Sequence, residues 1–299
     1  MEKYQWVIHE RLGSEQREIS LRTLMQKQWL LPKRFVHYLR IRRQVLINDK
    51  YEPMDTIVKS GDKITLNFIG DEFRNPTSNR YVPTPHPSLK VLFENRDLLV
   101  VDKPRGQKSH PNMAGESGTL MNDAAGYLGG QAYMVHRLDQ ETSGTMIVAK
   151  NPVVVPILDR LMSAGLLHRE YLALVEGQLS GMGEWNWPIG DSEVPWQRQV
   201  NGRNAQNAQT FYQVLKSTSE YSLVKLTLGT GRTHQLRVHL AYADHPIVGD
   251  PIYNPNSLEK MHLHAIRQQI ILPFTNKKQV IIAQPPHYFE EDLLKYKLE

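Results

Sequence analysis

A polar stretch between two apolar segments contains residues whose types and spacing suit chemistry. In MVHRLDQETSGTMIVAK, residues 134–150, Asp139 stands in a loop and Arg137 precedes it by two positions. In extended backbone both side chains point to the same side, so the guanidinium would favour the ionised carboxylate. An ionised aspartate can act as a nucleophile or stabilise a cation. The alternative is a loop aspartate that only caps a turn.

Two further polar positions lie in apolar surroundings. Tyr171 lies near the start of a predicted strand, HREYLALVEG, where its ring either packs in the core or serves a site. Arg237 lies one turn into a predicted helix, in GTGRTHQLRVH, and Arg232 stands before that helix. A buried arginine requires an anion or a wet edge, so a structural ion pair is the alternative at Arg237. These residues fit acid/base or nucleophilic chemistry without naming a reaction.

Several other chemistries are disfavoured. The chain contains no phosphate loop, no GxGxxG after a strand and no GxSxG turn. Its 12 histidines raise the question of zinc, but His234 and His239 have the wrong spacing for one helix face. His262 and His264 would share a strand face without an evident third ligand. We therefore expect neither a metal nor a cofactor.

Cysteine usage and the apolar pattern indicate the compartment. The chain has no cysteine, which excludes disulfides and thiol catalysis and fits a reducing cytoplasm. The first residues lack the pattern of a secretory signal, and no apolar run approaches the roughly 18 residues that span a membrane. We expect a cytoplasmic monomer that does not enter a membrane.

The positive charge is concentrated near the N-terminus. The formal net charge is +5, and residues 1–70, with 13 Lys or Arg and 8 Asp or Glu, account for the whole excess. A concentrated positive field attracts polyanions such as nucleic acid or an acidic membrane surface; the alternative is an ordinary solvated face. The stretch from Lys33 to Arg43 contains five basic residues and no acidic one. We expect these five to contact RNA: Lys33, Arg34, Arg40, Arg42 and Arg43.

The elements that must position these residues fall into two parts. Residues 17–44 predict two helices, with Ser20 as the cap of the first and Pro32 in the first turn of the second. Short strands follow, so residues 1–70 are expected to form a small α/β RNA-binding domain. The stretch 71–89, rich in Pro, Asn, Ser and Thr, predicts a linker.

Residues 90–299 predict one α+β catalytic domain. Strand-rich segments interrupted by few helices favour a mixed, largely antiparallel sheet over a doubly wound one. The predicted elements nearest the candidate residues are a strand–loop–strand at 132–150, strands at 168–177 and 221–232, and a helix at 233–244 stopped before Pro246.

Four motifs, in order, resemble those of one known family. HRLDQETSG is similar to the HRLDxxTSG signature of the RluA-type pseudouridine synthases, and LLVVDKPRGQKSHP to the family's first motif. HREYLALVEG resembles the motif with the active-site tyrosine, and TGRTHQLRVHLAYADHPIVGDPIY the third motif. LHAIRQQIILPF and AQPP resemble the closing segment, so residues 90–290 are covered. The resemblance implies the pseudouridine synthase fold and cofactor-free isomerisation of uridine to pseudouridine in structured ribosomal or transfer RNA.

The same resemblance implies a role for each candidate residue. Asp139 is the catalytic aspartate, which adds to the ribose or the uracil or assists loss of a ribose proton. Arg237 is its basic partner, and Tyr171 packs on the target base and shuttles a proton. Arg137 occupies the space of the flipped nucleotide; flipping is expected because the reacting atoms are inaccessible inside a stacked helix. Arg232 contacts phosphate or supports the structure.

The N-terminal part resembles the small αL RNA-binding domain, of ribosomal-protein type, that many of these enzymes carry. The usual form has G-x-V-x-V-N after the second helix, whereas this chain reads IRRQVLINDK without glycine. One alternative to an active synthase is an inactive RNA-binding or ribosome-assembly factor on the same scaffold. Another is a glycosidase-like hydrolase, which normally requires two carboxylates about 5–10 Å apart, with Glu141 as the second candidate.

Overall fold

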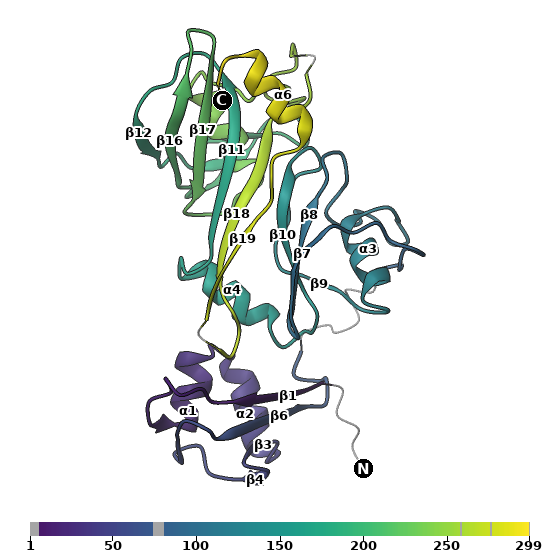
Figure 1. Cartoon of the computed structure of the whole chain (residues 1–299), viewed down its shortest axis with the longest axis vertical. Coiled ribbons are helices and arrows are strands. Elements are labelled where there is room, and N and C mark those ends of the chain that lie inside the picture. The colour runs from purple at the N-terminus through teal and green to yellow at the C-terminus, as the bar shows by residue number, and fades with distance from the viewer. Residues whose placement is uncertain (1–5, 74–80, 258, 276, 299) are drawn as a thin grey trace.

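The computed structural model describes residues 6–73, 81–257, 259–275 and 277–298. Figure 1 shows an elongated molecule, with a small N-terminal unit at one end and a larger sheet-rich part above it. Residues 74–80 of the predicted linker lie outside the described residues. The described remainder of 71–89 contains no helix or strand.

The N-terminal unit is a four-stranded antiparallel sheet covered by short helices (Figure 1). Its elements, including a separate β2–β5 pair, are β1 (Trp6–Arg11), β2 (Ile19–Ser20), α1 (Leu21–Thr23), the π-helical turn η1 (Leu24–Gln28), α2 (Lys33–Ile41), β3 (Val45–Ile47), β4 (Lys50–Tyr51), β5 (Ile57–Val58) and β6 (Lys63–Phe68). Ser20 caps α1 as predicted, since its hydroxyl accepts the N–H of Thr23 at 3.2 Å. The predicted first helix is present over residues 21–28, but after α1 it continues as a π-helical turn, in which the Trp29 N–H donates to the Leu24 carbonyl, an i to i+5 bond. Pro32 lies at the N-cap of α2, one position before its first turn.

The larger part is built on a ten-stranded sheet in the order β12-β16-β17-β11-β18-β10-β8-β7, with β19 on β18 and β9 on β10. Its strands are β7 (Val91–Glu94), β8 (Leu98–Lys103), β9 (Tyr133–Met134), β10 (Ser143–Ala149), β11 (His168–Glu176), β12 (Met182–Trp185), β16 (Thr210–Ser217), β17 (Tyr221–Leu228), β18 (Leu263–Ile271) and β19 (Lys278–Ile282). Among these described strands, β10 with β18 is the one parallel pair. The prediction of a mixed, largely antiparallel sheet is therefore confirmed.

The parallel pair holds the loop that precedes β10. All seven residues of β10 are buried, and Gly144 has a φ of 108°. A Cβ at Gly144 would lie 2.3 Å from the carbonyl oxygen of Ala265 in β18, closer than any side chain permits. Glycine is therefore required where β10 leaves the loop of Asp139 and meets β18.

Helices cover the sheet and its edges. They are α3 (Leu120–Tyr127), α4 (Val155–Ser163), α5 (Gln235–Tyr242) and α6 (His287–Lys295). The predicted helix at 233–244 is shorter at both ends, because α5 begins after His234 and stops at Tyr242. The sequence did not predict α6 or a small sheet of β13 (Ile189–Asp191), β14 (Arg198–Val200) and β15 (Arg203–Gln206), which packs on α5. No described helix is long and apolar enough to cross a membrane.

One apolar core continues from the N-terminal unit into the larger part. Trp29 and Leu31 belong to the same buried cluster as Ile157 of α4 and Phe274. The rings of Trp29 and Phe274 meet edge to face with centroids 5.3 Å apart. Arg160 of α4 donates to the carbonyls of residues 30 and 31, at 2.9 Å each. The two parts are therefore packed against each other.

Candidate active site

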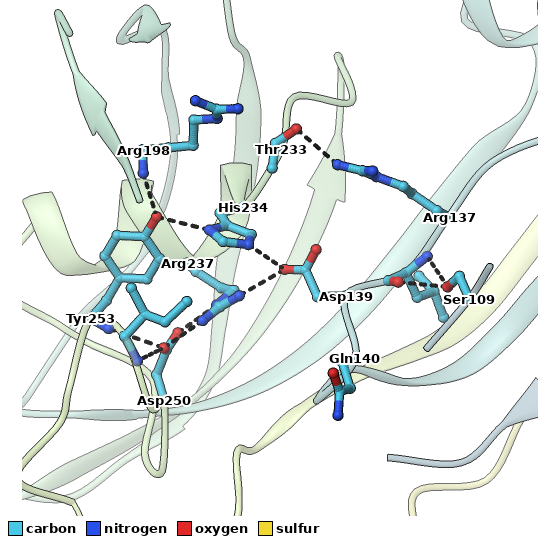
Figure 2. A network of polar contacts seen from close by, with 12 residues as sticks. Ser109, Arg137, Asp139, Gln140, Arg198, Thr233, His234, Arg237, Asp250 and Tyr253 are labelled. Atoms are coloured by element: carbon cyan, nitrogen blue, oxygen red, sulfur yellow. Dashed lines mark hydrogen bonds and ion pairs between the residues drawn. The ribbon is translucent and has the colours of Figure 1, made fainter. Parts of the chain in front are cut away.

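The carboxylate of Asp139 belongs to a network that joins a loop of the sheet to α5. Asp139 follows β9, and its Oδ2 accepts a hydrogen bond of 3.0 Å from Nη1 of Arg237. The same guanidinium donates from Nε and Nη2 to the two oxygens of Asp250, at 2.7 Å each. Figure 2 shows Arg237 between the two carboxylates. The planar set of donors thus bridges two acids.

Burial and hydrogen bonding determine the charges in this network. The side chains of Arg237 and Asp250 are 4% and 0% exposed, whereas that of Asp139 is 23% exposed. Burial opposes charge on Asp250, but the hydrogen bonds and charge of Arg237 outweigh it and lower the Asp250 pKa. Burial likewise opposes charge on Arg237, but the two carboxylates raise its pKa. Asp139 is therefore the accessible acid beside a fixed cation.

His234 connects this network to a second chain of hydrogen bonds. It stands at the N-cap of α5 with a φ of 57°, and its Nε2 lies 3.9 Å from Oδ2 of Asp139. Its Nδ1 lies 3.0 Å from the Tyr253 hydroxyl, which accepts the backbone N–H of Arg198 at 2.9 Å. Burial lowers the pKa of His234 against the attraction of Asp139, which favours the neutral ring.

A narrow cavity of about 100 Å³ opens beside Asp139. Tyr171 of β11 lines it and is 4% exposed, and Leu228, Leu236 and Leu263 provide apolar walls. Burial raises the pKa of the Tyr171 phenol, which keeps it protonated. The three residues predicted as catalytic, Asp139, Tyr171 and Arg237, line this cavity. Two residues predicted to contact RNA, Arg137 and Arg232, line it as well.

Two of these arginines differ in their surroundings. Arg137 is exposed, and its Nη2 donates to the Thr233 hydroxyl at 3.2 Å (Figure 2). Arg232 donates from Nη1 to the side chain of Gln206 at 2.6 Å and from Nε to the backbone carbonyl of Asn207 at 3.0 Å. These two hydrogen bonds stabilise the C-terminal end of β15, so Arg232 has a structural role there. Arg169, which the sequence did not single out, lines the same cavity.

The loop of Asp139 is supported from the segment that resembles the first family motif. The Ser109 hydroxyl donates to the carbonyl of Leu138 at 2.6 Å and accepts its N–H at 3.0 Å. Lys103 is fully buried and donates from Nζ to three carbonyls, including that of Gln140 at 3.1 Å. Burial lowers the Lys103 pKa to about 7 against the attraction of nearby carboxylates. These contacts fix the backbone on both sides of Asp139.

The histidines considered for zinc have separate partners. His239 contacts Thr210, His262 contacts Asp292, and His264 contacts Ser143. Across the part of the chain that the structure describes, no three His, Asp or Glu side chains gather as metal ligands. Glu141, the second carboxylate considered for glycoside hydrolysis, forms an ion pair with Arg105.

Sequence reasoning missed several residues of the site. They are Lys103, Ser109, Arg169, His234 as a neighbour of Asp139, Asp250 and Tyr253. A signal was present for Asp250 and Tyr253, because both lie in VGDPIY, at the end of the third motif.

The five basic residues of the N-terminal unit that were predicted to contact RNA lie on α2 or just beyond it. Four are exposed: Lys33, Arg34, Arg40 and Arg43. Arg42 instead forms ion pairs with Asp71 at 2.6 Å and Glu72 at 2.9 Å. Four of the five predicted RNA contacts are therefore open to solvent, and Arg42 stabilises the end of the unit.

Comparisons with known proteins agree with this architecture. A family model described as RNA pseudouridylate synthase matches residues 97–242, and one described as the RluD ribosomal pseudouridine synthase N-terminal domain matches residues 10–64. The uncharacterized RNA pseudouridine synthase YhcT of Bacillus subtilis is 37% identical over 255 residues, which cover 82% of each chain. The ribosomal large subunit pseudouridine synthase D of Nitrosomonas europaea is 33% identical over 238 residues, covering 74% of this chain and 68% of that relative.

A solved structure agrees as well. Human RNA pseudouridylate synthase domain containing 4 superposes with a TM-score of 0.58 at 25% identity, covering 70% of this chain and 94% of that one. The protein is an RNA pseudouridine synthase, an isomerase. Within that class, the chain belongs to the RluA/RluD family, which confirms the family predicted from its motifs.

Proposed function

We propose that this enzyme converts uridine to pseudouridine in large-subunit ribosomal RNA, with Asp139 as the catalytic aspartate. Relatives from Nitrosomonas europaea and Escherichia coli, 33% and 31% identical, are both named ribosomal large subunit pseudouridine synthase D. In the reaction the N1–C1′ bond breaks, the uracil turns and C5 bonds to C1′. C5 loses a proton and N1 gains one. Nothing is oxidised, reduced or hydrolysed overall, so the reaction requires no cofactor.

The observation that carries this proposal is the hydrogen bond of 3.0 Å between Asp139 and Arg237 beside the narrow cavity. Addition of Asp139 to the ribose or to the uracil requires an ionised carboxylate, and so does removal of a ribose proton. Arg237, held in place by Asp250, favours that form. All three pathways therefore require an ionised Asp139, and the neighbouring guanidinium of Arg237 favours that form.

The target uridine leaves its stack in the proposed reaction, because its reacting atoms are covered inside a helix. The uracil enters the narrow cavity and packs on the ring of Tyr171, while Arg137 occupies the vacated space in the RNA. Tyr171, whose phenol pKa is raised by burial, exchanges a proton with the base. The apolar walls of the cavity exclude water from the open glycosidic bond.

Replacing Asp139 by Asn tests the catalytic assignment, because it keeps the shape of the side chain and removes its charge. A large-subunit ribosomal RNA transcript labelled with [5-³H]uridine releases tritium when C5 bonds to the ribose. Wild-type enzyme is expected to release tritium and D139N to release none, with folding and RNA affinity retained. Undiminished release from D139N would contradict the assignment.

Pseudouridine mapping across all cellular RNAs, with and without the gene, tests the substrate. Loss of sites from large-subunit ribosomal RNA supports the proposal. If pseudouridine sites are lost only from transfer RNA, the substrate is transfer RNA and the proposed chemistry still holds. No lost site, together with no tritium release by the wild type, would indicate an inactive RNA-binding or ribosome-assembly factor.

A further inference from the structure

An exposed tryptophan stands at the rim of the active site. All five tryptophans are among the described residues; Trp29 and Trp185 are buried, two others are half-buried, and Trp196 is 88% exposed. Trp196 lies in the turn between β13 and β14 and has a φ of 70°, a conformation unfavourable for any residue with a Cβ. Neither its exposure nor its backbone contributes to stability, so a role in binding is the natural explanation.

Trp196 lines a second, broader cavity of about 540 Å³, within the range of roughly 300–1,000 Å³ typical of ligand pockets. This broad cavity shares part of its wall with the narrow one. The residues that line both are Arg137, Leu138, Asp139, Thr233, His234 and Arg237. Asp139 therefore lies where the two cavities meet, with Tyr171 on one side and Trp196 on the other.

The wall of the broad cavity is also cationic. Lys108, Arg137 and Arg198 line it together with Trp196. Lys108 is paired with Glu116 and Arg198 with Asp191, whereas Arg137 contacts the Thr233 hydroxyl and no acid among the described residues. An aromatic face beside cations is the combination that binds single-stranded nucleic acid, because bases stack on the ring and phosphates meet the cations.

The turn that carries Trp196 is tied to the catalytic network. The backbone N–H of Arg198 donates to the Tyr253 hydroxyl at 2.9 Å, and that hydroxyl lies 3.0 Å from Nδ1 of His234 (Figure 2). These bonds connect the first residue of β14 to the histidine that faces Asp139. Trp196, two residues earlier, is therefore held near the site and is not carried on a free loop.

We propose that the broad cavity is a subsite for the nucleotide next to the target uridine, and that Trp196 stacks on its base. This inference rests on the proposed function, because it assumes that the uracil occupies the narrow cavity. Because the two cavities share the wall at Asp139, a strand whose uridine reaches Asp139 continues along the broad cavity. The neighbouring base then meets Trp196, beside Lys108 and Arg198, the other cations of the same wall. Stacking tolerates every base, so the subsite supplies affinity for an unpaired strand beside the target.

Two substitutions of Trp196 test the subsite with the [5-³H]uridine-labelled large-subunit ribosomal RNA transcript. Trp196→Leu keeps apolar bulk and removes the ring, whereas Trp196→Phe keeps a ring. W196L is expected to raise Kd and KM by roughly 5- to 150-fold, equivalent to the loss of about 1–3 kcal/mol for one stacked base, and to change kcat far less. W196F is expected to recover most of the affinity. A merely structural role would not separate KM from kcat in this way.

Phe211→Leu is the matched control, because Phe211 is 40% exposed in β16 and lines neither cavity. Its affinity for RNA should equal that of the wild type. As a second measurement, RNA should quench the part of the tryptophan fluorescence that W196F lacks. Wild-type affinity in W196L, or a changed oligomeric state in place of a changed affinity, would overturn the proposal. If wild-type enzyme releases no tritium from this RNA, the proposed function fails instead, so the two failures are distinguishable.

Discussion

The carboxylate of Asp139 and the guanidinium of Arg237 are joined by a hydrogen bond of 3.0 Å across 98 residues of sequence. Two further donors of the same guanidinium are held by Asp250, which is fully buried. The buried acid therefore orients Arg237 and leaves one N–H for Asp139. The charge beside the carboxylate that we propose to react is in place before RNA binds, as electrostatic preorganisation requires.

Replacing Arg237 by Met would leave the Asp250 carboxylate buried without a cation. We expect the free energy of unfolding to fall by about 3–5 kcal/mol. Arg237→Lys keeps the charge but not the bidentate contact with Asp250, so we expect it to lower the free energy of unfolding less than Arg237→Met does. Urea unfolding measures both, with Arg137→Met as a control at an exposed position that should change by less than about 0.5 kcal/mol. An R237M protein as stable as the wild type would refute this account of Asp250.

The hydroxyl and the ring of Tyr171 can be separated by substitution. Tyr171→Phe keeps the ring for packing on the base and removes the proton that the phenol carries. We expect tritium release to fall by roughly 10²–10⁴-fold, the usual contribution of a positioned acid or base, with RNA affinity retained. Tyr171→Leu should lose both release and affinity. Equal release from Y171F and the wild type would limit Tyr171 to packing.

The exposed cations of the N-terminal unit are expected to neutralise RNA phosphates. Changing Lys33, Arg34, Arg40 and Arg43 together to Gln should weaken binding and lower the slope of log K against log salt concentration by about 2–4, since each phosphate contact contributes roughly 0.7–0.9. Filter binding of the full chain at several salt concentrations measures this slope. Deleting the unit is a poorer test, because deletion would uncover Phe274.

The control for this experiment changes exposed cations elsewhere. Lys278 and Lys297 are exposed on β19 and just beyond α6, and their change to Gln should leave the slope near the wild-type value. If the N-terminal variant keeps the wild-type slope, the larger part of the chain provides the phosphate contacts.

His136 is expected to make stability depend on pH. Its Nε2 accepts the N–H of Ile147 at 3.1 Å, and burial lowers its pKa to about 3 from the ordinary 6.5. Between these values the unfolded chain binds a proton that the folded chain does not. The free energy of unfolding therefore falls with falling pH, by up to about 1.4 kcal/mol per unit for this group. Its contribution is complete above pH 6.5.

His136→Gln isolates that contribution, because the amide oxygen can accept the same N–H and does not titrate. Urea unfolding between pH 6.5 and 4.5 should show a shallower loss of stability for the variant than for the wild type. Parallel profiles would show that His136 is not the titrating group.

The sequence singled out Asp139, Tyr171 and Arg237, which line one cavity, because each lies in a short motif with local spacing. It could not pair Arg237 with Asp250, because contacts between segments depend on how the chain packs. The sheet class followed from strand-rich patterning, whereas β15 is exposed along its whole length and lacks the apolar alternation that predicts a strand. The subsite of Trp196 lies in this small sheet, so it was missed with it.

Helix geometry was partly predictable for a similar reason. Ser20 signalled the start of the first helix correctly, since capping is local. The apolar spacing of Leu24 and Met25 fits α-helical and π-helical turns alike, so the pattern did not reveal the i to i+5 bond at Trp29.

The packing of Trp29 on Phe274 has a consequence for the choice of RNA. Because both parts share one core, the separation between the basic face of α2 and Asp139 is a property of the folded protein. An RNA that contacts both α2 and Asp139 must have its phosphate backbone and its target uridine separated by that fixed distance. We infer that an RNA bound at both places is selected by its three-dimensional shape and not by a short run of bases.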